Sequence, residues 1–322
     1  MKYIAPVLII TIAVILTASF ETPKDTKDNI PRTVELATAI IPELHPHEHT
    51  HGDSMMQATH HKFSYSEKVS YPYDLWIKKI SFNLQNADDT VLHHADLRRL
   101  DQYNEKCNAF RPILSIGEDS MYNPSAVLPD GYAQYIPKNT FLQLSTMFHN
   151  PLPPVGFGKE YKDVSTKITM TLASEEEINN LKPVDFIFLA IMEEGCGSTF
   201  TVPANTDEFI AGTSTPSTES FSSYTFPGDG AIVYMGAHLH GWEGGQALDV
   251  YLNGEPLKHY DTKKADRPYG YNTIHGQESF RVKAGDQITI TATYSNPYPE
   301  PITGAMGMLG IYYAPDNPKV LR

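Results

Sequence analysis

The amino-acid sequence predicts an all-β protein made of two tandem antiparallel β-sandwiches of the jelly-roll kind. Residues 168–172, ITMTL, alternate apolar and polar side chains, as a strand with one buried face requires. The 322 residues include 21 glycines and 24 prolines, which suits many short strands joined by turns. A chain of this length has room for about two domains, and we place the sandwiches at residues 62–190 and 191–322.

Short apolar or alternating runs predict the remaining strands, which we expect at residues 141–144, 186–190, 231–234, 248–252, 288–293 and 309–313. Asn253-Gly254 predicts a hairpin turn because both residue types tolerate a positive φ, and residues 284–286, AGD, predict another turn. One short helix is expected, because Ser174 and Glu177 form a capping box that opens a segment reaching Leu181.

Residues 1–20 predict a secretory signal peptide. Lys2 precedes an apolar run at residues 7–16, and small residues follow it. The run is shorter than the roughly 20 residues that span a bilayer, with an uncleaved anchor as the alternative. No cysteine stands directly after the apolar run, where a lipoprotein signal would need one, and this excludes a lipoprotein. We therefore expect a secreted or periplasmic protein with no stable membrane insertion after signal cleavage.

Residues 21–61 predict a flexible, His-rich segment rather than a domain. The segment contains four prolines and the run HPHEHTHG at residues 45–52, with His60 and His61 close behind. A plain linker and a device that captures Cu or Zn ions are both open. Residues 47–51 match the HExxH pattern of zinc proteases, but that pattern needs a helix, which Pro46 and Gly52 disfavour.

Charge and cysteine content narrow the classes of partner. The formal net charge is −13 at pH 7, which argues against nucleic acid because its binding depends on Lys and Arg neutralising phosphates. An anionic membrane surface is disfavoured for the same reason. Cys107 and Cys196 are the only cysteines, and in an exported chain they favour one disulfide over a metal or redox pair.

The pattern His238-x-His240 is the strongest sign of a metal site in the sequence. On a strand, residues two apart face the same side, so both imidazoles can reach one ion. Imidazole suits Cu, Zn, Fe and Ni. The glycines that follow leave room for a ligand to approach, so the sequence predicts a metal ion at this strand.

Further candidate ligands lie elsewhere in the chain. His93 and His94 are adjacent, so a regular strand aims them at opposite faces unless a bulge or a strand end intervenes. Met147 and His149 lie two residues apart further along. Met306 offers a thioether, a soft ligand that favours Cu(I), although most methionines on strands fill the core.

The order of these residues resembles the copper type II, ascorbate-dependent monooxygenases, the relatives of dopamine β-monooxygenase and peptidylglycine α-hydroxylating monooxygenase. The resemblance covers roughly residues 76–315 and is clearest in PGDGAIVYMGAHLHGWEGG, VKAGDQITITATYSNP and GAMGMLGIYYAP. It implies an oxygen-activating copper in the C-terminal sandwich, bound by His238, His240 and Met306. Met308 is the alternative sulfur ligand.

The resemblance also implies a second copper, in the N-terminal sandwich, that relays electrons. His93 and His94 match the adjacent pair of ligands in that family. The third position departs from the pattern: aligned at Asn150, the family's histidine falls on Met147, while His149 stands two residues later. We expect His149 as the third ligand, with Met147 as the alternative.

The function implied by the resemblance is that of an exported copper-dependent monooxygenase. It would hydroxylate a C–H bond of a small molecule with O2, one or two copper ions, and ascorbate or a similar reductant. Gly236 and Gly310 stand where the peptide-hydroxylating relative has its substrate-binding Arg and Tyr, so a peptide carboxylate is not expected as a ligand. A non-catalytic copper protein for storage, delivery or sensing, and a cupin using His238, His240 and Glu243, are the alternatives.

Overall fold

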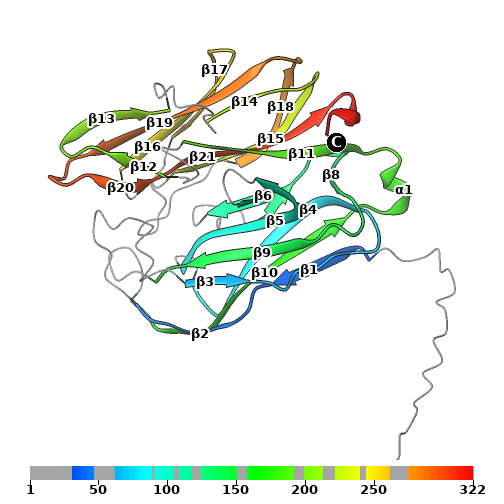
Figure 1. Ribbon diagram of the computed structural model, residues 1–322, viewed down its shortest axis with the longest axis horizontal. Coiled ribbons are helices and arrows are strands. Elements are labelled where there is room, and N and C mark those ends of the chain that lie inside the picture. Colours follow the sequence, from blue (N-terminus) through cyan, green and yellow to red (C-terminus); the bar gives the residue numbers. More distant parts are fainter. Residues whose placement is uncertain are drawn as a thin grey trace, which may run out of the picture. The chain divides into compact units, whose positions relative to one another are not determined.

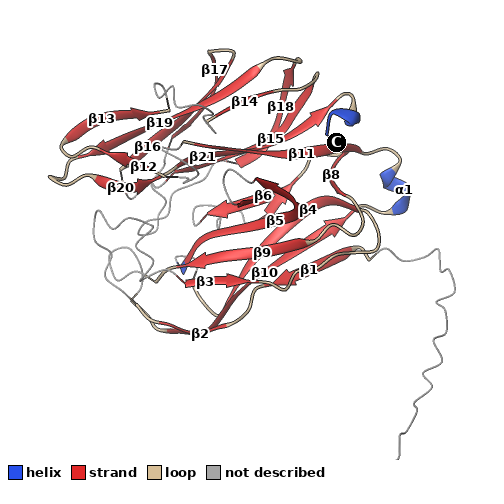
Figure 2. Ribbon diagram, viewed as in Figure 1, coloured by secondary structure: helices blue, strands red, loops and turns tan. Residues whose placement is uncertain are grey.

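The structure of the chain is a computed structural model that describes residues 31–46, 62–88, 91–104, 109–117, 125–150, 158–191, 199–212, 222–239, 244–261 and 275–321. Most of these residues lie in β-strands (Figures 1 and 2). The prediction of an all-β protein with tandem sandwiches of mainly antiparallel strands is confirmed. In the described parts of the chain, no helix is both long and apolar enough to span a bilayer.

The described strands of the N-terminal half are β1 (Thr33–Ala37), β2 (Ile41–Leu44), β3 (Lys62–Tyr65), β4 (Leu75–Gln85), β5 (Leu92–Asn104), β6 (Ala109–Gly117), β7 (Ser125–Val127), β8 (Tyr132–Ile136), β9 (Leu142–Phe148), β10 (Tyr161–Leu172) and β11 (Lys182–Ala190). Helix α1 (Glu175–Ile178) lies between the last two. The predicted capping box is present, because the Ser174 backbone N–H donates to Glu177 Oε2 at 2.8 Å.

The described strands of the C-terminal half are β12 (Phe200–Val202), β13 (Thr206–Ala211), β14 (Ser223–Thr225), β15 (Gly230–Leu239), β16 (Gly245–Leu252), β17 (Glu255–Asp261), β18 (His275–Val282), β19 (Gln287–Asn296), β20 (Ile302–Ala305) and β21 (Gly307–Pro315). A short 3-10 helix, η4 (Pro318–Leu321), follows. Every strand predicted from the sequence overlaps one of the observed strands.

One sheet runs through both halves of the chain in the order β1-β10-β4-β8-β11-β21-β15-β18. Its pairings are antiparallel apart from β8 with β11. Strand β11 therefore joins the N-terminal strands to the C-terminal ones within a single hydrogen-bonded sheet. The division of the chain at residues 190 and 191 stays a prediction, since this sheet continues across it.

A smaller sheet packs on each half of the large one. In the N-terminal half it has the order β3-β9-β5-β6, and Phe148 of β9 packs against Val164 of β10 and Leu44 of β2. In the C-terminal half, the sheet β13-β19-β16-β17 shares one apolar core with β15 and β21. The two cores are what make the two sandwiches, because each sheet buries one apolar face.

Strands β1 and β2 lie within residues 21–61, for which the sequence predicts a flexible segment. Val34 and Leu36 are buried while their neighbours are exposed, which is the alternation of an edge strand on a core. They pair with Met170 and Ile168 of β10. The described part of this segment, residues 31–46, is thus part of the sheet, and the prediction of a flexible segment is wrong there. The His-rich run from residue 47 to 61 lies outside the described residues.

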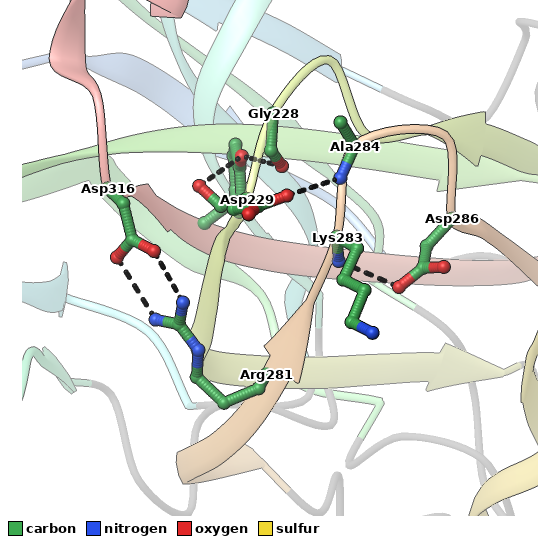
Figure 3. Close-up of polar contacts among 8 residues, drawn as sticks. Gly228, Asp229, Arg281, Lys283, Ala284, Asp286 and Asp316 are labelled. Atoms are coloured by element: carbon green, nitrogen blue, oxygen red, sulfur yellow. Dashed lines mark hydrogen bonds and ion pairs between the residues drawn. The ribbon is translucent and has the colours of Figure 1, made fainter.

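A polar network fixes the turns at one end of the C-terminal sandwich (Figure 3). The Ala284 backbone N–H donates to Asp229 Oδ1 at 2.9 Å, and Arg281 forms an ion pair with Asp316. Gly285 has a φ of 88°, as the predicted turn at residues 284–286 requires. These carboxylates are engaged in holding backbone and guanidinium groups, which is a structural role.

Candidate functional site

Strands β5 and β9 bring three of the predicted ligands together. The ring centroids of His93 and His94 are 4.3 Å apart, and those of His93 and His149 are 4.8 Å apart. The pairing of β5 with β9 shifts register between Leu92 and His94. This irregularity is the bulge that the sequence requires for adjacent histidines to act together, because it breaks the strict alternation of side chains.

His238 joins this group from the other sandwich. It lies near the end of β15, and its ring centroid is 4.9 Å from that of His94, with the two rings at 80°. The sequence predicts two separate sites, one in each sandwich, but the structure brings their histidines into ring contact. We call His93, His94, His149 and His238 the histidine cluster.

Hydrogen bonds link β6 both to β11, which pairs with β21, and directly to β21 of the C-terminal sandwich. Arg111 of β6 donates from one guanidinium nitrogen to Asp185 Oδ2 and to the Phe186 carbonyl of β11, both at 2.7 Å. The Tyr312 hydroxyl of β21 donates to the Ile113 carbonyl of β6 at 3.2 Å. Since β6 pairs with β5 and β21 pairs with β15, these bonds connect the two sheets that carry the histidine-bearing strands.

The histidine cluster is largely removed from solvent. His93 is 1% exposed and His149 is 2% exposed, whereas His94 and His238 are partly buried. One ring nitrogen of each histidine is fully buried: His93 Nδ1, His94 Nε2, His149 Nε2 and His238 Nε2. The three ring contacts thus form a chain from His149 through His93 and His94 to His238, and each ring has one nitrogen atom with little access to bulk water.

The spacing of the rings suits a shared ion. An imidazole nitrogen lies about 2 Å from a bound transition metal and the ring centroid about 1 Å further, so two rings on one tetrahedral ion have centroids about 5 Å apart. The observed separations are 4.3, 4.8 and 4.9 Å. As the side chains stand, no three described His, Cys, Asp or Glu residues are oriented to hold an ion. Rotation of the rings within the same cluster is needed for ligation.

Two of the candidate methionine ligands are cross-strand neighbours of histidines in the cluster. Met308 pairs with His238 in the register of β15 with β21, and Met147 pairs with His94 in that of β5 with β9. Met306 is 5% exposed and packs in an apolar cluster with Met308 and Ala190. Its carbonyl accepts a hydrogen bond from the buried hydroxyl of Tyr294. Apolar packing thus accounts for the burial of Met306.

Several residues of the sequence analysis lie outside the described residues. They are His240, Glu243, the histidines of residues 47–61, and both cysteines, Cys107 and Cys196. The participation of His240 in a site and the disulfide therefore stay predictions. Gly254 occupies the predicted hairpin turn with a φ of 83°.

The comparisons with known proteins do not support a copper monooxygenase. No family model matches the chain, and no curated protein matches it. Among solved structures, the chain is similar to peptide N-glycanase F, with 8% identity and a TM-score of 0.41, over 89% of this chain and 97% of that one. A second structure of that glycosylasparaginase, from Flavobacterium meningosepticum, gives 9% identity and a TM-score of 0.40 over 90% and 97%. The major capsid protein P2 of bacteriophage PM2 gives 7% and 0.30 over 88% and 97%.

The identification as a copper type II monooxygenase is therefore wrong, since no family model and no curated protein of that class matches the chain. With it fall the predicted copper-dependent hydroxylation, the oxidoreductase class, and the alternative of a copper storage, delivery or sensing protein. The geometry gives a physical reason as well. The resemblance needs one site in each sandwich, whereas His94 and His238 form a single cluster at the junction. The solved structures share a β-rich fold with this chain, and such low identity carries nothing more.

Asp249 and His259 form a second polar contact of interest, outside the histidine cluster. His259 Nδ1 lies 2.6 Å from Asp249 Oδ1, and His259 Nε2 lies 2.8 Å from Asp261 Oδ1. Asp249 and His259 are cross-strand partners on β16 and β17. The hydrogen bonds to Asp249 and then to Asp261 raise the pKa of His259. The imidazolium is thus the form that this trio stabilises.

This trio predicts a pH-dependent contribution to stability. A histidine whose folded-state pKa lies above its unfolded value stabilises the fold fully below the unfolded pKa and loses that effect as pH rises through the folded pKa. The loss of unfolding free energy in His259→Asn is therefore expected to be larger at pH 6 than at pH 9, and below about 1 kcal/mol because the ring is half exposed. Urea denaturation at the two pH values measures this. Equal losses at both would contradict the prediction.

Proposed function

We propose that this protein binds a transition-metal ion through the histidine cluster at the junction of its two sandwiches, with zinc(II) as the reference ion. The observation that carries the proposal is the set of three ring contacts that joins His93, His94, His149 and His238. His93 and His94 lie on β5, His149 immediately follows β9 of the same sheet, and His238 lies on β15 of another sheet. Histidine is the commonest metal ligand among side chains, which favours a shared binding function for these four residues.

The donor atoms favour a transition-metal ion such as Zn(II), which is intermediate between hard and soft ions in its choice of ligands. Neutral imidazole binds Zn, Cu, Fe and Ni, whereas Ca and Mg prefer oxygen ligands. Four nitrogen donors complete the tetrahedral shell that is typical of structural zinc sites. The ion would then join the N-terminal to the C-terminal sandwich, because His238 belongs to a different sandwich from the other three histidines.

The copper ions and the ascorbate-like reductant predicted from the sequence remain predictions of cofactors. So do the small-molecule substrate and the absence of nucleic-acid partners. We further propose that the chain is exported, because of the signal-like residues 1–20.

Metal content measured by mass spectrometry tests the proposal. The full chain is stripped with a chelator, dialysed against equal concentrations of Zn(II), Cu(II), Ni(II) and Ca(II), and analysed after removal of free ions. Because residues 47–61 hold five further histidines, the measurement uses a variant with those five replaced by alanine. We expect about one equivalent of zinc per chain and no calcium. A variant of this kind that retains no transition metal would overturn the proposal.

A further inference from the structure

The outer face of the sheet β3-β9-β5-β6 carries exposed aromatic rings. Phe63 and Tyr65 of β3 are 55% and 49% exposed, while Ser64 between them is buried. Phe141, immediately before β9, is 52% exposed. Large apolar side chains gathered on one face of a soluble protein mark a binding surface more often than chance. We call this the aromatic face.

The strand register arranges the aromatic face in rows. One row crosses all four strands as Tyr65, Ser145, Asp96 and Ser115, each paired with the next. Directly paired residues point to the same side of a sheet, so Tyr65 lies on the same side as the three polar residues. Phe63 heads the adjacent row, opposite Met147. Aromatic rings therefore stand at one end of a polar strip, in which Asp96 and Ser115 are partly exposed and Ser145 is buried.

Hydrogen bonds fix the orientation of the Asp96 side chain in this polar strip. Arg98 donates to Asp96 Oδ2 at 2.6 Å, and the Ser115 hydroxyl donates to Asp96 Oδ1 at 2.7 Å. The Arg98 and Asp96 side chains are 35% and 23% exposed. The guanidinium has five N–H donors and the carboxylate accepts several hydrogen bonds, so both retain capacity for a ligand. Their charges cancel, and the strip offers donors and acceptors with no net charge.

The composition of this face selects the class of ligand. An anionic polymer is disfavoured because Asp96 neutralises Arg98 and the whole chain carries −13. A fully apolar partner would bury the Asp96 and Arg98 side chains without replacing their hydrogen bonds to water. A neutral sugar chain satisfies both features: its hydroxyls donate and accept, and its C–H faces pack on aromatic rings.

We propose that the aromatic face binds a neutral polysaccharide, with Phe63 and Tyr65 as stacking residues and Asp96 and Arg98 as hydrogen-bonding residues. The two rings are two residues apart on one strand, about 7 Å along it, so neighbouring units of an extended chain can contact both. This site does not depend on the metal. His94 lies in the same row as Phe63, and Met147 stands between them. The polar strip is the adjacent row.

Affinity electrophoresis tests the proposal with three soluble neutral polymers: a β-glucan, a xylan and a galactomannan. Wild-type protein is expected to migrate more slowly in a gel containing at least one of them. Phe63→Ala and Tyr65→Ala are each expected to raise the dissociation constant about tenfold. Tyr298→Ala is the matched control, because Tyr298 is 41% exposed in the C-terminal half, and it is expected to leave the retardation unchanged.

Two further arms separate this site from others. Retardation in the presence of a chelator is expected to persist, so a failure of metal binding and a failure of sugar binding are distinguishable. Retardation by none of the three polymers would overturn the proposal. So would equal loss in Tyr298→Ala and Tyr65→Ala, or retardation by a polyanion such as heparin alone.

Discussion

Zinc at 100 times its dissociation constant is expected to add about 2.7 kcal/mol to the unfolding free energy of the protein. In the double variant His94→Ala/His238→Ala the gain at the same zinc concentration is expected to fall to about 0.4 kcal/mol, which corresponds to a hundredfold weaker site. The reason is that this pair supplies the ring contact between the sandwiches. Guanidinium denaturation with and without zinc measures both gains, in the variant that lacks the five histidines of residues 47–61.

The control for this experiment is His259→Ala. His259 is an exposed histidine held by two carboxylates on the far pair of strands β16 and β17, and its loss is expected to leave the zinc gain intact. The apo stability of the double variant, measured in the same experiment, separates misfolding from loss of ligands. A full zinc gain in a well-folded double variant would contradict a site at the histidine cluster.

Gly244→Ala is expected to destabilise the protein by about 3 kcal/mol or more. Gly244 has a φ of 92°, and a Cβ there would lie 2.0 Å from the carbonyl oxygen of Ser295. Both the strained backbone, at about 1–3 kcal/mol, and the overlap with a backbone atom, at about 1–3 kcal/mol, contribute. The Ser295 backbone N–H also donates to the Gly244 carbonyl at 2.9 Å, so the strand cannot move away freely. Urea denaturation provides the measurement.

Gly254→Ala separates the two contributions to this loss. Gly254 has a φ of 83°, but a Cβ there would meet no atom within 4 Å. Only the backbone strain applies, so a loss of about 1 kcal/mol is expected. If the two variants lost the same stability, close approach of the backbone at Gly244 would not be the cause.

The local pattern of residues was sufficient to predict seven of the strands and the helix cap. Alternation at residues 168–172 predicts part of β10, and Ser174 with Glu177 predicts the start of α1. The same rule would have found β1, because Val34 and Leu36 alternate with polar residues. Nearby prolines and the histidines of the following run masked this signal, so the segment is interpreted as flexible. The prediction for residues 21–61 therefore followed the composition of the whole segment rather than the alternation within Thr33–Ala37.

The candidate ligands were also visible in the sequence, but their grouping was not. The sequence analysis assigns His93, His94 and His149 to one ion and His238 to another. Their grouping accompanies the Tyr312 hydrogen bond between the sandwiches and the register shift beside His94. The resemblance to monooxygenases supplied the assumption that His94 and His238 lie at separate sites, whereas their rings are in contact.

The sequence by itself determined seven of the strands, two turns and the helix cap, because those structures depend on side chains within a few positions of each other. Only the tertiary structure decided that one sheet crosses both halves of the chain and that His94 contacts His238. The same holds for the row of Tyr65, Ser145, Asp96 and Ser115, which comes from four strands. Such arrangements follow from the burial of whole sheet faces, a property shared among distant segments that no local pattern encodes.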